Sequence, residues 1–376
     1  MPAGRFDEVN VSALARLIDH GHLDAVVCRS GVNVAYLSGI ATPGTLGRHL
    51  DLAATPRPTF VIWPAEGEPI LVTSEIAAGL ARATSWIETV RTYRDYREDA
   101  EECLAAVIEG AGLGRARVGF DISWFGAKRW AELKGRLPDV DAVDVTDDMD
   151  RVRAVKTPAE VERLRAAAAL LDRCLADVFP TVRVGQSERA VHARIVARAT
   201  ELGADSIHGI LQSSDNPVLY GGESDVRLVE GSVIRTDYVL YLNGYAANLS
   251  RPLHVGAPSD ALLDRYQAYV SVCRDVVGLL RSGRRGGDIH ESIQDAFRSV
   301  SLEPGPAISG HGIGRWFHQQ YPLCVPGSTD VLEPGMVIAL EPISGHWHLQ
   351  DEFLITGSDP VRISDGFDWG DLSRSG

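Results

Sequence analysis

The stretch Gly310-His311-Gly312-Ile313-Gly314 places one histidine among three glycines in the last fifth of a 376-residue chain. Glycine permits close backbone approach and unusual dihedral angles, which a histidine packed in a core does not need. We therefore interpret His311 as a residue of a functional site. A second histidine, His318, follows seven positions later.

Two acidic residues lie in apolar sequence on either side of this stretch. Glu341 follows Ala339-Leu340, and Asp237 lies in the strand-like segment 234–239. An ionised carboxylate among apolar residues is unfavourable unless it is paired or has a function. Both acids are therefore candidate site residues. The amide residue Asn248 stands eleven positions after Asp237.

Together these motifs resemble the C-terminal domain of the aminopeptidase P, methionine aminopeptidase and creatinase family, known as the pita-bread fold. In the peptidases of this family the matching pattern is Asp, Asp, His, Glu, Glu, and it binds two divalent metal ions. In this chain the order is Asp237, Asn248, His311, Glu341 and Gln350. An amide oxygen can bind a hard cation, but it carries no charge and the adjacent NH2 group repels the ion. Two amides at bridging positions therefore argue against a two-metal site.

The resemblance also indicates residues around this pattern. His318 is similar to the family's second histidine, which forms a hydrogen bond with substrate. Family members have a further histidine a few residues after an upstream Asn. Here no histidine stands at the matching place after Asn216, and His208 lies too early to match. Tyr220 is the nearest proton-active group, and an ordinary core or lid aromatic is the alternative for it.

Glu352 is a candidate to restore the missing carboxylate. It stands two positions after Gln350 in a strand-like segment. Side chains two apart on a strand point to the same face, so both can reach one site. A position at the rim of the site or at an interface is the alternative for Glu352.

The remaining sequence indicates two domains. The first 150 residues alternate helix-like and strand-like patches, which favours a small α/β domain. They resemble the family's N-terminal domain, whose recurrent element matches residues 33–39. A charged connector then precedes Thr157-Pro158-Ala159-Glu160, a capping box that begins a long helix. We predict an N-terminal α/β domain over residues 1–150 and a pita-bread catalytic domain of α+β class over residues 151–376.

Composition limits the class of partner and the compartment. The net charge of −14 argues against nucleic acid, because phosphate binding needs clustered Lys and Arg. The five cysteines are odd in number and contain no C-x-x-C pair, which suits reduced thiols. No signal-like segment and no apolar run long enough for a membrane helix is visible. These features predict a cytoplasmic protein with no membrane partner.

Loss of charged metal ligands resembles the metal-independent branch of the family, which includes creatinase and ectoine hydrolase. This resemblance implies cofactor-free hydrolysis of a C–N bond in a small amidine, guanidino or cyclic amide metabolite. Glu341 would act as base or nucleophile, His311 would carry the proton to the leaving nitrogen, and Asp237 would bind the cationic end. Asn248 and Gln350 would orient the substrate.

Two other functions stay open. An Xaa-Pro aminopeptidase-like, dipeptidase-like or lyase-like enzyme with one divalent metal ion could use Asp237, His311 and Glu341. A non-catalytic binding member of the fold is the second alternative. The resemblance also implies a homodimer in which one subunit's N-terminal domain covers the other's pocket. Arg48 is a candidate to reach across and bind a substrate carboxylate.

Overall fold

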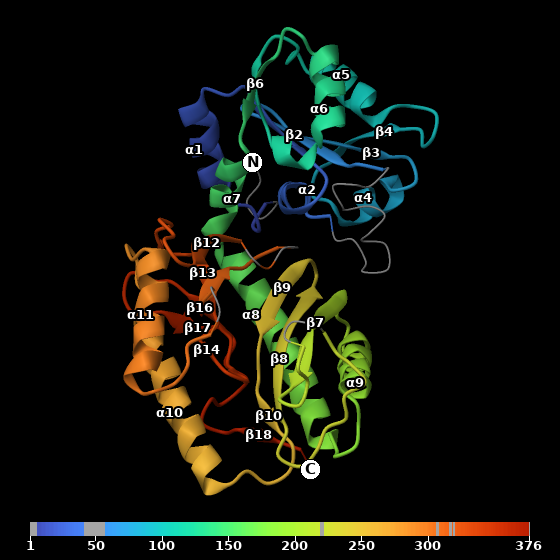
Figure 1. Ribbon diagram of the computed structural model, residues 1–376. Helices are drawn as coiled ribbons and strands as arrows, with labels where there is room; N and C mark the ends of the chain where they lie inside the picture. Colours follow the sequence, from blue (N-terminus) through green and yellow to red (C-terminus); the bar gives the residue numbers. More distant parts are fainter. Residues whose placement is uncertain are drawn as a thin grey trace. The chain divides into compact units, whose positions relative to one another are not determined.

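The computed structural model describes residues 6–40, 57–218, 222–305, 308–315, 318 and 320–375. The chain divides into two compact units, Met1–Arg153 and Ala154–Gly376 (Figure 1). The first unit is α/β and the second is α+β with two main sheets, so the predicted fold class is confirmed. None of the helices described combines the length and the hydropathy needed to span a bilayer.

The first unit is built on one mixed sheet with the strand order β4-β3-β2-β1-β5-β6. β2 pairs antiparallel with β1 and β3, whereas the other neighbours pair in parallel. The strands are β1 (Ala25–Arg29), β2 (Phe60–Pro64), β3 (Ile70–Ser74), β4 (Thr89–Tyr93), β5 (Arg117–Phe120) and β6 (Asp141–Asp144). The helices are α1 (Val11–Gly21), α2 (Val32–Ser38), α4 (Ala78–Thr84), α5 (Ala100–Gly110), α6 (Ala127–Arg136) and α7 (Thr146–Ala154), with a 3-10 turn at Ile122–Trp124.

Apolar side chains cover both faces of this sheet. On β1, Val26 and Cys28 pack with residues of α1, α2 and α7, whereas Ala25 and Val27 pack with residues of α5 and α6. Successive strand side chains point to opposite faces, so a strand that is buried on both faces is apolar throughout. The short run Ala25-Val26-Val27-Cys28 therefore forms the centre of the unit.

The second unit contains two main sheets and a hairpin. One sheet has the order β18-β10-β8-β7 with β9 paired to β8, and the other has the order β12-β11-β13-β16-β17. The strands of the first sheet are β7 (Ser206–Ser213), β8 (Val233–Leu242), β9 (Tyr245–Leu249), β10 (Leu253–His254) and β18 (Ser373–Arg374). Those of the second sheet are β11 (Gly310–Gly312), β12 (Gln320–Cys324), β13 (Val337–Leu340), β16 (Asp351–Leu354) and β17 (Val361–Arg362). The hairpin is β14 (Ile343–Ser344) with β15 (Trp347–His348).

Each sheet is packed against its own helices. The helices are α8 (Pro158–Val178), α9 (Glu188–Glu201), α10 (Asp260–Val277) and α11 (Gly286–Ser299), with a 3-10 turn at Phe179–Thr181. Apolar residues of α8 and α9 form a core with β7 and β8, and those of α10 and α11 form another with β13 and β16. Figure 1 shows α10 and α11 (orange) alongside the second set of strands.

Helix α8 begins as the sequence predicts. The Thr157 side chain accepts a hydrogen bond from the Glu160 backbone N–H, and the Glu160 side chain accepts one from the Thr157 N–H. Pro158 occupies the first turn, where its missing N–H has no intrahelical partner to lose. The predicted capping box is therefore confirmed.

The two sheets of the second unit meet where β9 approaches β16. Ser250 and Gln350 form an isolated bridge between them. Next to this bridge, the fully buried Arg251 donates a hydrogen bond of 2.7 Å to the Gln350 carbonyl. Arg251 also forms an ion pair of 2.8 Å with Asp351. A third link is the 2.8 Å ion pair of Arg251 with Asp172 on α8. Arg251 thus fixes the start of β16 relative to β9, and with it the two amides of the sequence pattern.

Candidate active site

Five predicted site residues come from strands or strand ends of the second unit. β8 and β9 pair antiparallel, which brings Asp237 and Asn248 to the same part of one sheet. In the other sheet β11 carries His311, and Glu341 and Gln350 stand directly after β13 and before β16. The structure therefore brings together the five positions that the sequence pattern selected.

The two amides form a hydrogen-bonded chain among these residues. Asn248 Nδ2 donates to Asp237 Oδ1 at 3.0 Å and to the Tyr238 carbonyl at 3.1 Å. Gln350 Nε2 donates to Asn248 Oδ1 at 2.9 Å, while Gln350 Oε1 accepts from the Ser250 hydroxyl at 3.1 Å. Both amides thus have acceptors at their NH2 groups, and these contacts define which way each amide points.

His311 is held by its own backbone. Its Nδ1 lies 2.9 Å from the Gly312 carbonyl, which can only accept, so Nδ1 carries the proton. Burial lowers the pKa of His311, although backbone hydrogen bonds at Gly312 and His318 oppose the shift, so the ring is neutral and Nε2 has a lone pair. Nε2 lies 3.1 Å from Asn248 Oδ1 and 3.5 Å from Gln350 Nε2, whose NH2 group can donate to it. An acceptor nitrogen and an amide oxygen at this separation could also share a cation.

Glu341 is a buried carboxyl with an unused oxygen. It is 4% exposed, and its Oε1 has no hydrogen-bond partner among the residues that the structure describes. This oxygen lies 3.9 Å from His311 Nε2. Burial raises the pKa of Glu341 well above its ordinary value and Asp237 raises it further, whereas Arg235 opposes the shift. A buried carboxyl in this state is poised to receive a cation or a proton.

His348 joins the site although the sequence pattern does not select it. Its Nε2 lies 3.7 Å from Glu341 Oε2, and the side chain is fully buried. Neither ring nitrogen has a hydrogen-bond partner within the described ranges. Burial lowers the pKa of His348 to about 3, against the opposing effect of Asp237. The available signal was its position two residues before Gln350, on the same face of an extended segment.

Two further histidines extend the site outward from His311. The ring centroids of His311 and His318 are 5.9 Å apart, and those of His318 and His208 are 5.8 Å apart. Burial lowers the pKa of His318 to about 4, and both neighbouring imidazoles add to this effect. His208 comes from β7, where it also stacks on Tyr241 with centroids 6.0 Å apart. The sequence spacing excluded His208 from the family pattern, but the pairing of β7 with β8 brings it to the site.

Glu352 lies behind Asn248. Its Oε1 accepts a hydrogen bond of 2.9 Å from the Asn248 backbone N–H, and the side chain is fully buried. Burial raises the pKa of Glu352 well above its ordinary value, partly offset by that hydrogen bond. Glu352 Oε1 therefore contacts the backbone of β9. Two other predicted site residues, Arg48 and Tyr220, lie outside the described residues.

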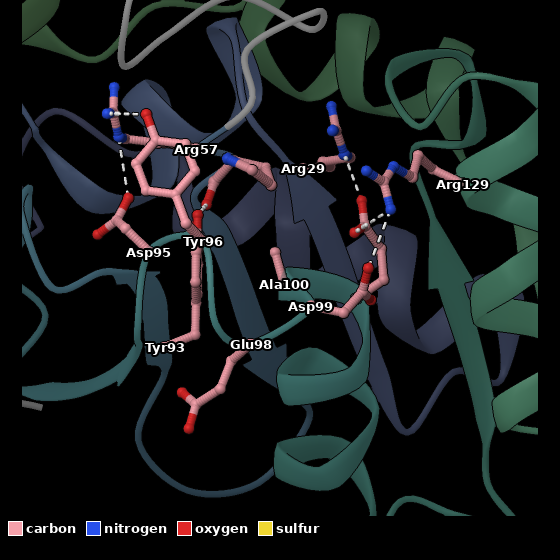
Figure 2. A pocket seen from close by; sticks show the side chains of 11 residues that line it. Arg29, Arg57, Tyr93, Asp95, Tyr96, Glu98, Asp99, Ala100 and Arg129 are labelled. Atoms are coloured by element: carbon pink, nitrogen blue, oxygen red, sulfur yellow. Dashed lines mark hydrogen bonds and ion pairs between the residues drawn. The ribbon is translucent and has the colours of Figure 1, made fainter.

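A separate cavity of about 160 Å³ lies in the first unit, next to the start of α5. Figure 2 shows that its charged side chains other than Glu98 pair with neighbouring side chains of the lining. Arg57 forms an ion pair with Asp95 at 2.9 Å, and Arg129 contacts Asp99 at 3.0 Å. Glu101 lies between Arg29 and Arg129, at 3.4 and 3.5 Å. These mutual pairings are a structural network, and we assign no chemistry to the cavity.

Known proteins resemble both units. The family described as metallopeptidase family M24 matches residues 162–367, and the creatinase/prolidase N-terminal domain matches residues 11–155. Probable dipeptidase PepE of Mycobacterium tuberculosis is 27% identical over 325 residues, 82% of this chain and 84% of the relative. Xaa-Pro dipeptidase of Lactobacillus helveticus is 25% identical over 315 residues, 80% of each chain.

Solved structures show the same fold. Dipeptidase PepE from Mycobacterium ulcerans superposes with a TM-score of 0.77 at 24% identity, covering 97% of this chain and 96% of the other. Prolidase from Pyrococcus horikoshii has a TM-score of 0.76 at 20% identity, covering 95% and 98%. These likenesses confirm the pita-bread fold and the domain that precedes it.

The comparisons correct two predictions. A cofactor-free, creatinase-like enzyme acting on an amidine, guanidino compound or cyclic amide is contradicted, because the relatives are named as dipeptidases and the matching family as metallopeptidases. The prediction gave too much weight to the two lost charges at Asn248 and Gln350, and too little to the two carboxyls and the histidine that remain. Because the M24 match covers more than half of the sequence, the chain belongs to metallopeptidase family M24.

Proposed function

We propose that this chain hydrolyses the C–N bond of a short peptide, with dipeptides as the substrate class and one divalent cation as cofactor. The names of the relatives, probable dipeptidase PepE and Xaa-Pro dipeptidase, support the reaction class. The observation that carries the proposal is the buried Glu341 Oε1, which has no hydrogen-bond partner within the described residues and lies 3.9 Å from His311 Nε2.

A second cation does not fit the donors present. Asn248 turns its NH2 group toward Asp237, and Gln350 turns its NH2 group toward Asn248. The NH2 hydrogens therefore take up lone pairs of Asp237 Oδ1 and Asn248 Oδ1, which a second ion would need as ligands. Neither amide adds negative charge to balance a second ion. Moreover, no three His, Cys, Asp or Glu side chains in the described part of the chain are already arranged as metal ligands.

One cation fits when an amide oxygen is counted among the donors. His311 Nε2 and Asn248 Oδ1 lie 3.1 Å apart, and a cation between them would replace the long 3.5 Å contact of Gln350 Nε2 with His311 Nε2. Glu341 Oε1 is the nearby buried oxygen that has no hydrogen-bond partner among the described residues. Asp237 adds a second carboxyl on the other side of Asn248. A set of carboxylate, imidazole and amide oxygen suits ions such as Mn²⁺, Co²⁺ or Zn²⁺.

The surrounding residues would then act as follows. A bound divalent cation supplies Lewis-acid polarisation of the scissile carbonyl. His318 stays neutral at neutral pH because its pKa is lowered to about 4, so its ring can donate one hydrogen bond to the substrate. His348 lies 3.7 Å from Glu341 Oε2, so its neutral ring would orient the ionised carboxyl as a hydrogen-bond donor. Asn248 and Gln350 orient Asp237 and His311 through their amides.

The test is peptide hydrolysis with controlled metal content. Purified protein treated with chelator should lose cleavage of Ala-Pro and Ala-Leu and recover it with about one equivalent of Mn²⁺, Co²⁺ or Zn²⁺. Mass-spectrometric metal analysis should show that Glu341→Gln lowers this occupancy, whereas the exposed control Glu333→Gln leaves it unchanged. Intact dipeptides under every metal condition, with peptide still bound, would instead indicate a non-catalytic binding protein.

A further inference from the structure

Strand β8 carries an arginine on the same face as the site carboxyl Asp237. Arg235 and Asp237 are two positions apart, so their side chains point to one face of the sheet. On the opposite face, Ile234, Tyr238 and Leu240 belong to the apolar core shared with α8 and α9. Arg235 is only 5% exposed, so its charge is held inside the domain and beside the site.

The β14–β15 hairpin brings a second part of the site to the same strand. Hairpin strand β15, which carries His348, packs against β8. Val233, two residues before Arg235 on β8, lines one cavity with residues 344–347 of the hairpin. Arg235 therefore lies on β8 between Val233, beside the hairpin, and the site carboxyl Asp237.

The spacing of these groups suits one class of ligand. Two residues along a strand span about 7 Å, so the backbone positions of Arg235 and Asp237 lie about this far apart. An extended dipeptide spans about the same distance. A guanidinium matches a carboxylate with two parallel N–H···O bonds, and burial strengthens such a pair relative to water.

We infer that Arg235 binds the free carboxylate of the substrate and thereby selects dipeptides over longer or carboxyl-blocked peptides. The reacting carbonyl then lies at Asp237 and Glu341, with one residue between it and the guanidinium. This inference rests on the proposed function for the identity of the substrate. The comparisons identify no residue for this role, and the five-residue metal pattern does not include Arg235.

Binding of a non-hydrolysable probe tests the inference apart from turnover. The probe is the reduced-amide isostere of Ala-Leu, in which CH2–NH replaces the peptide bond, prepared with a free carboxylate and as the carboxamide. Isothermal titration should give the wild type about 10- to 100-fold preference for the carboxylate form, as expected for charged hydrogen bonds. Arg235→Gln should reduce the preference to within about 3-fold, and Arg235→Lys should give an intermediate value because lysine keeps the charge without the fork.

Arg265→Gln is the matched control, because this exposed arginine lies over Trp347 on the same hairpin, with 5.8 Å from guanidinium to ring centroid. It should keep the wild-type preference. A wild type without preference would overturn the inference even if Arg235→Gln fails to fold, and so would an unchanged preference in a folded Arg235→Gln. If the preference holds but no dipeptide is cleaved, the proposed function fails and the assignment of Arg235 stands.

Discussion

The imidazole of His348 lies against the carboxyl of Glu341, with 3.7 Å between His348 Nε2 and Glu341 Oε2. This separation is longer than a hydrogen bond, and both side chains are almost wholly buried. The pair is unfavourable for folding, because unsatisfied polar groups lose their hydration without a compensating bond. A loss of folding stability of this kind is typical of active sites, where activity and stability place opposing demands on the same residues.

His348→Leu should therefore separate stability from activity. Leucine fills a similar volume and removes two buried nitrogens without hydrogen-bond partners in the described residues. We expect the free energy of unfolding to stay unchanged or to rise by about 1 kcal/mol, while kcat/KM for dipeptides falls at least about 10-fold. Urea unfolding and steady-state kinetics measure the two quantities. A less stable variant with wild-type activity would show that His348 is a packing residue.

Glu341→Gln and His311→Ala should each abolish turnover without unfolding the protein. The two side chains present the buried carboxyl oxygen and the imidazole lone pair that face each other at 3.9 Å. Loss of either group removes a donor to the proposed cation, so we expect the rate to fall by at least a factor of about 10², beyond the roughly 10- to 100-fold typical of groups behind metal ligands. Glu352→Gln is the comparison, because glutamine keeps an oxygen to accept the Asn248 N–H and should have a smaller effect. Equally deep loss in Glu352→Gln would transfer the catalytic role to Glu352.

Restoring the two acids should convert the site from one metal ion to two. Asn248→Asp with Gln350→Glu replaces both inward NH2 groups with charged oxygens. Without metal, the added carboxylates repel their neighbours and should lower the melting temperature. With Mn²⁺, calorimetry should show about two equivalents bound, compared with one for the wild type, and a larger gain in melting temperature. A wild type that already binds two equivalents of Mn²⁺ would show that Asn248 and Gln350 do not exclude a second ion.

Local patterns predicted the fold class and selected five residues that the structure brings together. Helix α8 follows from its capping box, and His311, Asp237 and Glu341 follow from charged or glycine-flanked positions in apolar sequence. His208 and His348 could not be selected in this way. They reach the site through pairing of β7 with β8 and packing of β15 on β8, which depend on contacts distant in sequence.

The nature of the cofactor was the part of the site that the sequence pattern predicted wrongly. A count of lost charges at Asn248 and Gln350 cannot show that His311 Nε2 and Asn248 Oδ1 lie 3.1 Å apart. That relationship depends on which ring nitrogen meets the Gly312 carbonyl, a detail of tertiary geometry. The homodimer and the role of Arg48 remain predictions, since a single chain is described and Arg48 lies outside the described ranges.

A buried acid in the first unit predicts a pH dependence of stability that is independent of the active site. Burial raises the pKa of Asp121 to about 8, although the Arg29 backbone N–H at 3.0 Å and Asn33 Nδ2 at 3.2 Å favour its ionised form. In the unfolded chain the same carboxyl has an ordinary pKa near 4. Between about pH 4 and pH 8 the folded state therefore holds a proton that the unfolded state releases.

The free energy of unfolding should consequently fall as pH rises through this window, by at most about 1.4 kcal/mol per pH unit for one proton. Below about pH 4 and above about pH 8 this carboxyl contributes no slope, because both states bind the same number of protons. Urea unfolding at pH 5, 6, 7 and 8 should show that Asp121→Asn flattens the slope, even if it lowers stability at pH 5. The exposed control Asp139→Asn should keep the wild-type slope, and an unchanged slope in Asp121→Asn would show that Asp121 is ionised in the folded protein.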